Sequence, residues 1–191
     1  MQVLVRFGNA LGAAGIAMVL LIGFILQLEL KELPCPLCML QRVGFVLAGM
    51  GFLLNLRFGS QPAHYGIALL GAMFGVAASS RQVMLHVVPG TGHYGSAIFG
   101  LHFYSWALLL FLAVIGGIAA LLVLSGSGRP DHEPRGMRTS PQFAGFAKFA
   151  AYFLIVMTFA NAAASFVQCG PIECPDDPAS YWLLDHLHVT R

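Results

Sequence analysis

The sequence predicts an all-α fold, in which five transmembrane helices form one bundle within a single membrane domain. Of the 191 residues, 58% are hydrophobic and 9% are charged, whereas charged residues make up about 25% of a typical soluble domain. The chain also contains five apolar segments of the length, about 17 to 25 residues, that crosses a bilayer. We therefore expect a multi-pass protein surrounded by the lipid bilayer. The net charge of +2 gives no reason to expect a nucleic-acid partner.

The predicted spans cover residues 9–28, 39–56, 63–80, 101–124 and 149–167. The first span follows one basic residue, Arg6, as a signal peptide would, but it is long for a signal peptide and no A-x-A site ends it. We interpret it as a retained anchor. Residues 82–100 contain Pro89 and many glycines, which predicts an interfacial loop, and the polar residues 125–141 predict a water-exposed loop.

Basic residues predict the orientation of the chain. With a cytoplasmic N-terminus, the cytoplasmic basic residues are Arg6, Arg57, Arg129, Arg135, Arg138 and Lys148, and those on the opposite side are Lys31, Arg42, Arg81 and Arg191. Because cytoplasmic loops are enriched in lysine and arginine, this distribution favours a cytoplasmic N-terminus. The C-terminal tail, residues 168–191, then lies on the opposite side of the membrane.

The chain has four cysteines, which form two closely spaced pairs: Cys35 with Cys38, and Cys169 with Cys174. Four predicted spans separate Cys38 from Cys169, and an even number of spans places both pairs on one face. By the charge argument that face is outside the cytoplasm, where disulfides persist.

The first pair, in the stretch PCPLCMLQR, is a C-x-x-C motif where the second span begins. A helix N-terminus favours the thiolate form of cysteine, and Pro36 suits the first turn of a helix. These features favour a redox pair. A static disulfide or half of a metal site remains an alternative.

Arg42 follows Cys38 by four residues, which places it on the same helix face and about 6 Å deeper. There it can hydrogen-bond an anionic or carbonyl oxygen beside Cys38. A membrane quinone offers such oxygens and accepts the two electrons that a dithiol releases. The alternative is that the arginine extends to lipid phosphates.

The second pair lies in FVQCGPIECPDDP, a stretch rich in proline and turn residues. Thiol–disulfide exchange requires access and a good leaving thiolate, so an exposed loop suits it. The neighbouring Glu173, Asp176 and Asp177 do not favour a thiolate, so we do not predict an intrinsically activated nucleophile. The alternative is a disulfide that only stabilises the tail.

The stretch CPLCMLQR after the first span, together with SSRQVMLHVVP at residues 79–89, resembles the bacterial disulfide-bond formation protein B (DsbB) family over at least residues 10–90. The resemblance implies a four-helix core and a quinone-dependent thiol oxidase of the bacterial inner membrane. It implies that Cys38 lies nearest the quinone, that Cys35 exchanges with the second pair, and that Arg42 holds the quinone head group. The second pair would oxidise a periplasmic thioredoxin-fold partner of the DsbA type. Ubiquinone and menaquinone both remain open.

The chain departs from the family pattern in the position of its second pair. The family has four spans, with the second pair in the loop before the last one, whereas here residues 82–100 contain no cysteine. The pair instead follows a fifth span, so the chain is a five-span variant. Which of Cys169 and Cys174 meets the partner does not follow from the resemblance.

Three histidines, His86, His93 and His102, fall near the outer loop, together with Tyr94 and Tyr104. His86 is the best candidate for a quinone contact, because it follows the third span closely. The alternative is that all are ordinary residues of the membrane interface. Two other functions remain open for the whole chain, namely a tetrathiolate metal site and a membrane subunit with two structural disulfides. Of these, we expect no metal.

Overall fold

The computed structural model confirms the predicted all-α fold. It describes residues 2–29, 33–88, 90, 95, 97–125, 141–171, 174, 178 and 180–186. The helices are α1 (Gln2–Glu29), α2 (Pro36–Phe58), α3 (Pro62–His86), α4 (Phe103–Ser125), α5 (Pro141–Cys169) and the short α6 (Trp182–His186). A small antiparallel hairpin, β1 (Ala97–Ile98) and β2 (Leu101–His102), precedes α4.

Within the described ranges, five helices are long and apolar enough to cross a membrane, as predicted. The helices extend beyond the predicted apolar segments. In particular, α3 continues to His86, so the predicted loop at residues 82–100 starts too early. The prediction ended the span at the first polar residues, but the backbone hydrogen bonds of a helix continue through polar residues such as Gln82. Several residues used above lie outside the described ranges: Lys31, Pro89, His93, Tyr94, residues 126–140, Glu173, Asp176, Asp177 and Arg191.

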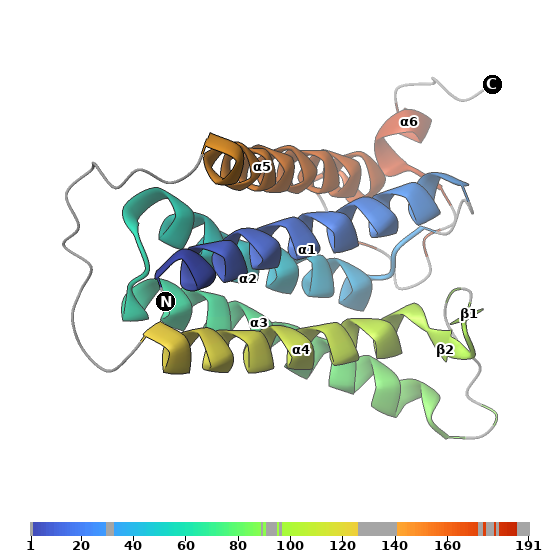
Figure 1. Ribbon diagram of the computed structural model, residues 1–191. Helices are drawn as coiled ribbons and strands as arrows, with labels where there is room; N and C mark the ends of the chain where they lie inside the picture. Colours follow the sequence, from blue (N-terminus) through green and yellow to red (C-terminus); the bar gives the residue numbers. More distant parts are fainter. Residues whose placement is uncertain are drawn as a thin grey trace.

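Helix α3 packs between α2 and α4, and α1 packs on α2 (Figure 1). The extra helix, α5, lies along α1. The C-terminal ends of α1, α3 and α5 meet the N-terminal ends of α2 and α4 at one end of the bundle, which also carries the hairpin and α6 (Figure 1). The two cysteine pairs therefore lie at the same end.

Small residues set the spacing of α2 and α3. A Cβ atom added to Gly44 would lie 2.9 Å from the Cα of Gly75, and one added to Gly71 would lie 2.5 Å from the backbone nitrogen of Ala48. The ring of Phe111 fills the space beside Gly75 and stacks on Phe45, with centroids 3.9 Å apart. In lipid, where the hydrophobic effect does not drive helices together, such close packing supplies much of the stability.

A buried polar cluster ties the opposite end of the bundle. Asn55 donates from Nδ2 to Oδ1 of Asn9 at 2.8 Å, and Asn9 donates from Nδ2 to the hydroxyl oxygen of Tyr65 at 2.8 Å. The backbone N–H of Gln61, in the α2–α3 turn, donates to Oδ1 of Asn55 at 3.1 Å. These bonds join α1, α2 and α3, so the helices that carry the cysteine end are anchored at their far ends.

Candidate functional site

The first cysteine pair opens α2. Cys35 is the N-cap residue, and its Sγ accepts a hydrogen bond from the backbone N–H of Cys38 at 3.2 Å. Pro36 occupies the first turn, where its missing N–H costs nothing. Both thiols are free; Cys35 is buried and Cys38 is half-buried. The C-x-x-C motif thus presents both sulfurs to the positive end of the helix dipole.

A residue that the sequence analysis missed, Gln82 of α3, contacts both sulfurs. Its Nε2 lies 3.3 Å from the Sγ of Cys35 and 3.5 Å from the Sγ of Cys38. Its Oε1 accepts a hydrogen bond from Nε2 of Gln41 at 2.8 Å. Gln82 is fully buried, so its amide acts on the sulfurs without competition from water. The sequence feature that could have pointed to Gln82 is its uncharged amide inside SSRQVMLHVVP, directly after the charged Arg81.

The Cys35 thiol holds its proton strongly. The hydrogen bond with Cys38 and burial both raise the pKa of Cys35, while the contact with Gln82 lowers it by less. Burial and the contact with Cys38 therefore disfavour the thiolate form of Cys35.

Arg42 reaches from α2 to α1. Its Nη1 donates to Oε1 of Gln27 at 2.8 Å and its Nη2 donates to the backbone oxygen of Gly23 at 3.2 Å. Both acceptors belong to the protein, so the guanidinium group is held inside the bundle. An arginine fixed in this way retains further N–H groups that a ligand oxygen can accept from.

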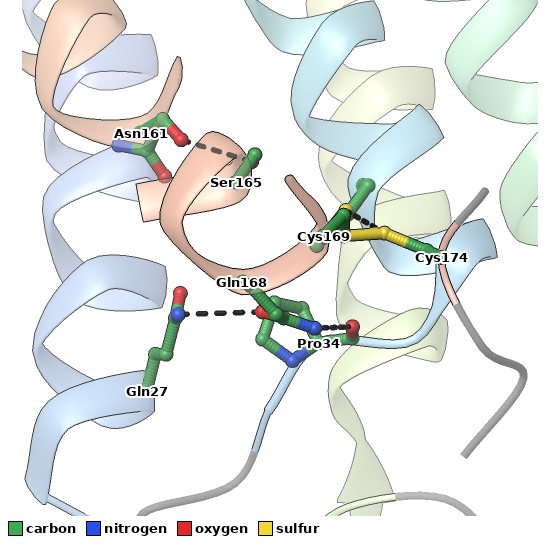
Figure 2. Close-up of a disulfide and its surroundings, with 8 residues drawn as sticks. Gln27, Pro34, Asn161, Ser165, Gln168, Cys169 and Cys174 are labelled. Carbon is green, nitrogen blue, oxygen red and sulfur yellow. Dashed lines mark hydrogen bonds between the residues drawn. A yellow bond between two sulfur atoms is a disulfide. The ribbon is translucent and has the colours of Figure 1, made fainter. Parts of the chain in front are cut away.

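The contacts of Arg42 continue to α5. Nε2 of Gln27 lies 3.5 Å from Oε1 of Gln168 and 3.3 Å from the hydroxyl of Tyr181. Gln168 in turn donates from Nε2 to the backbone oxygen of Pro34 at 2.8 Å (Figure 2). Gln27 and Gln168 are both buried. The chain of amides therefore joins α1, α5 and the residue that precedes Cys35.

The second pair forms a disulfide at the end of α5. Cys169 is the last residue of the helix and is buried, while Cys174 is half-buried (Figure 2). The Sγ atoms of Cys169 and Cys174 lie 3.6 Å and 3.5 Å from the Sδ of Met39. Met39 directly follows Cys38, so the second disulfide packs against the first turn of α2. Gly170, with φ of 63°, allows the chain to turn sharply after α5.

A cavity of about 380 Å³ lies beside Cys38 and is lined by residues of α1, α2, α3, α4 and the hairpin. Its polar lining comes from Gln27, Cys38, Gln41, Arg42 and Gln82. The remaining lining is aliphatic and aromatic, and includes Phe45, Phe99, Phe103, Tyr104 and Trp106. An apolar cavity with a few convergent polar groups is typical of a small-molecule site. Its volume and its arginine suit a planar, apolar ring that carries carbonyl oxygens.

His86 is not among the residues that line this cavity. Its Nδ1 lies 2.8 Å from the backbone oxygen of Gln82, and its ring stacks on Tyr104 with centroids 5.2 Å apart. His102 stacks on the same tyrosine at 5.4 Å. Tyr104 lines the cavity, so His86 lies one layer away from it. A direct quinone contact by His86 stays a prediction.

Comparison with known proteins covers the part of the chain that holds most of this site. Residues 5–96 match the family described as disulfide bond formation protein DsbB. Over these residues, just under half of the chain, the sequence is similar to the DsbB family. The match includes α1, α2 and α3 with Cys35, Cys38, Arg42 and Gln82, but neither α5 nor the second cysteine pair.

Individual relatives agree with the family match. The protein named "Disulfide bond formation protein B" in Nitrosomonas eutropha is 36% identical to this chain over 75 residues, which cover 36% of this chain and 46% of the relative. The protein of that name in Chromobacterium violaceum is 39% identical over 74 residues, covering 36% and 45%. The one in Chromohalobacter salexigens is 30% identical over 90 residues, covering 44% and 52%. The chain thus spans about half the length of the curated relatives it matches. No solved structure gives a significant match.

Proposed function

We propose that this protein is a membrane thiol oxidase of the DsbB family that re-oxidises a periplasmic DsbA-like thioredoxin-fold partner and passes two electrons to a membrane quinone. The observation that carries the proposal is that Cys38 and Arg42 line one apolar cavity, while the Cys169–Cys174 disulfide contacts Met39 beside Cys38. Two redox pairs and an acceptor cavity at one end of the bundle are the parts that such a relay needs.

The cavity residues fit a quinone head group. A bound quinone supplies a two-electron acceptor with two carbonyl oxygens. Arg42, held by Gln27 and the backbone of Gly23, would donate to one of these oxygens and orient the ring towards Cys38. The aromatic residues Phe103 and Trp106 would enclose the ring and exclude water. The head group and first tail atoms would fill the cavity whether the molecule is ubiquinone or menaquinone.

The cysteines would act in series. Oxidation of the partner's dithiol releases two electrons and two protons to the Cys169–Cys174 disulfide. Exchange with the first pair then restores the Cys169–Cys174 disulfide and leaves Cys35 and Cys38 reduced. When Cys35 and Cys38 re-form their disulfide, the two electrons and two protons leave the protein, and the quinone is their acceptor. Each exchange requires a thiolate to attack a disulfide sulfur, and the buried Cys35 offers little access to the thiol of another protein.

The protein is a multi-pass membrane protein, and we assign it to the bacterial inner membrane with a cytoplasmic N-terminus. The excess of basic residues on the assigned cytoplasmic side supports this orientation. It places the hairpin, α6 and both cysteine pairs at the periplasmic face, where a partner is available and disulfides persist.

The experiment that tests this function follows quinone reduction by the purified full-length protein after a reduced DsbA-type thioredoxin-fold protein is added. Wild type and the variants Cys38→Ser, Cys174→Ser and Arg42→Ala are each assayed with a ubiquinone analogue and with a menaquinone analogue. The proposal expects no turnover in either cysteine variant and a higher quinone requirement in Arg42→Ala. Full activity in Cys174→Ser would reduce the second pair to a structural disulfide. A wild-type protein without quinone reduction, but with zinc bound and all four thiols protected, would favour a tetrathiolate site instead.

A further inference from the structure

The two sulfurs of the second disulfide differ in their surroundings. Cys169 ends the 29-residue helix α5 and is 7% exposed. Cys174 lies five residues later, beyond the turn at Gly170, and is half-buried. A bulky protein thiol can approach only a sulfur with an open side, since attack occurs along the axis of the disulfide bond. Cys174 is the more accessible of the two.

Cys169 is also connected, through its own contact and that of its neighbour, to the residues around Cys35. Gln168, the residue before Cys169, donates to the backbone oxygen of Pro34, the residue before Cys35. On the other side, the Sγ of Cys169 contacts Met39, whose backbone N–H donates to the oxygen of Cys35 at 3.0 Å. Contacts therefore bracket Cys35 from both directions along the chain. Met39 also contacts Cys174, so the distinction rests on burial, on the end of α5 and on Gln168.

We infer that Cys174 is the outer cysteine, which the partner attacks, and that Cys169 is the inner cysteine, which attacks Cys35. This inference rests on the proposed function and assigns an order to its exchange steps. Cys169, at the end of α5, is therefore not the cysteine that meets the partner, because the end of α5 faces the start of α2.

The steps balance as follows in bonds and electrons. The partner's thiolate bonds to the Sγ of Cys174, the Cys169–Cys174 bond breaks, and Cys169 leaves as a thiolate. Cys169 bonds to the Sγ of Cys35, the Cys35–Cys38 bond breaks, and Cys38 leaves as a thiolate. The partner's second thiol then displaces Cys174 and forms the partner's own disulfide. Finally Cys174 displaces Cys35 from Cys169. The partner has lost two electrons and two protons, and Cys35 and Cys38 have gained them.

The inner step is tested without a partner or a quinone. The variant Cys38→Ser/Cys174→Ser retains only Cys35 and Cys169, and its matched control Cys38→Ser/Cys169→Ser retains only Cys35 and Cys174. Both are treated with copper phenanthroline, and the disulfide to Cys35 is quantified over time. We expect the Cys35–Cys169 disulfide to form at least about tenfold faster, because exchange and oxidation depend on proximity and access. Equal rates, or faster formation with Cys174, would overturn the assignment.

The outer step is tested with wild type and a DsbA-type protein whose second active-site cysteine is replaced by serine, so that the mixed disulfide cannot resolve. Peptide mass spectrometry should place the partner on Cys174 and should find Cys169 linked to Cys35. A partner adduct on Cys169 would overturn the assignment, as would the absence of any adduct in a preparation that reduces quinone normally with the intact partner. Loss of quinone reduction in wild type would refute the proposed function itself, and the cross-linking rates would still decide which sulfur lies next to Cys35.

Discussion

The Gln168 side chain donates a 2.8 Å hydrogen bond to the backbone oxygen of Pro34, although 134 positions separate the two residues in sequence. Each residue directly precedes a cysteine of a different pair. The bond lies in a buried site, where a polar group without a partner is costly. It therefore fixes the end of the fifth helix against the start of the second, and it does so in a part of the chain that the family match does not include.

Replacing Gln168 with leucine should slow transfer between the two pairs while leaving the first pair functional. Leucine keeps the approximate volume but removes the donor, and a net loss of about 1 kcal/mol corresponds to roughly a fivefold change in the docked population. We expect quinone reduction driven by a DsbA-type dithiol to fall severalfold. Reduction driven by dithiothreitol, a small dithiol that does not depend on the docking of the second pair, should change little.

The matched control for Gln168 is Ser165→Ala, one turn earlier on α5, whose hydroxyl donates to the backbone oxygen of Asn161 within the same helix (Figure 2). This variant should resemble wild type in both assays. Equal losses with the protein dithiol and with dithiothreitol in Gln168→Leu would show that the glutamine supports the whole bundle rather than the docking of the second pair.

Replacing Gln82 with leucine should move the titration of Cys35 to higher pH. The Gln82 amide lowers the pKa of the Cys35 thiol, because its N–H stabilises the thiolate; removing it leaves burial as a cause that raises the pKa. In a Cys38→Ser background, which removes the coupling between the two thiols, the rate of Cys35 alkylation by iodoacetamide should therefore rise at a higher pH than with Gln82 present. An unchanged pH profile would mean that the amide does not act on this sulfur.

Replacing Gly75 with leucine should destabilise the bundle. A side chain at this position would collide with the ring of Phe111, which is fully buried, and overpacking of this kind typically costs about 1–3 kcal/mol. We expect a lower temperature of aggregation in detergent. The control is Gly116→Leu on α4, where an added Cβ meets nothing within 4 Å. Equal thermal stability of the two variants would contradict the close packing of α3 against Phe111 of α4.

The sequence predicted what depends on local spacing. A helix that begins at Pro36 necessarily places Cys38 and Arg42 on one face, and five apolar segments necessarily become five spans in lipid. It did not predict Gln82, Gln27 or Gln168, because each acts on a residue that is between 15 and 134 positions away. The inward direction of such an amide depends on helix rotation and packing, which no local pattern specifies. For the same reason the sequence did not show that Tyr104 lies between His86 and the cavity.

Replacing Arg42 with lysine should impair the use of quinone although the positive charge remains. Arg42 uses two different nitrogens on two acceptors of α1, Oε1 of Gln27 and the oxygen of Gly23, and lysine cannot reproduce this fork. A lysine held less firmly should orient a quinone oxygen poorly, so we expect the KM for quinone to rise by roughly tenfold, with a smaller change in the rate at saturating quinone. Quinone-concentration series with a fixed amount of reduced partner measure both quantities. Arg57→Lys, at the exposed far end of the same helix, serves as the control and should behave as wild type. If Arg42→Lys also behaves as wild type, a positive charge at this depth is sufficient, and the geometry of the arginine does not position the quinone.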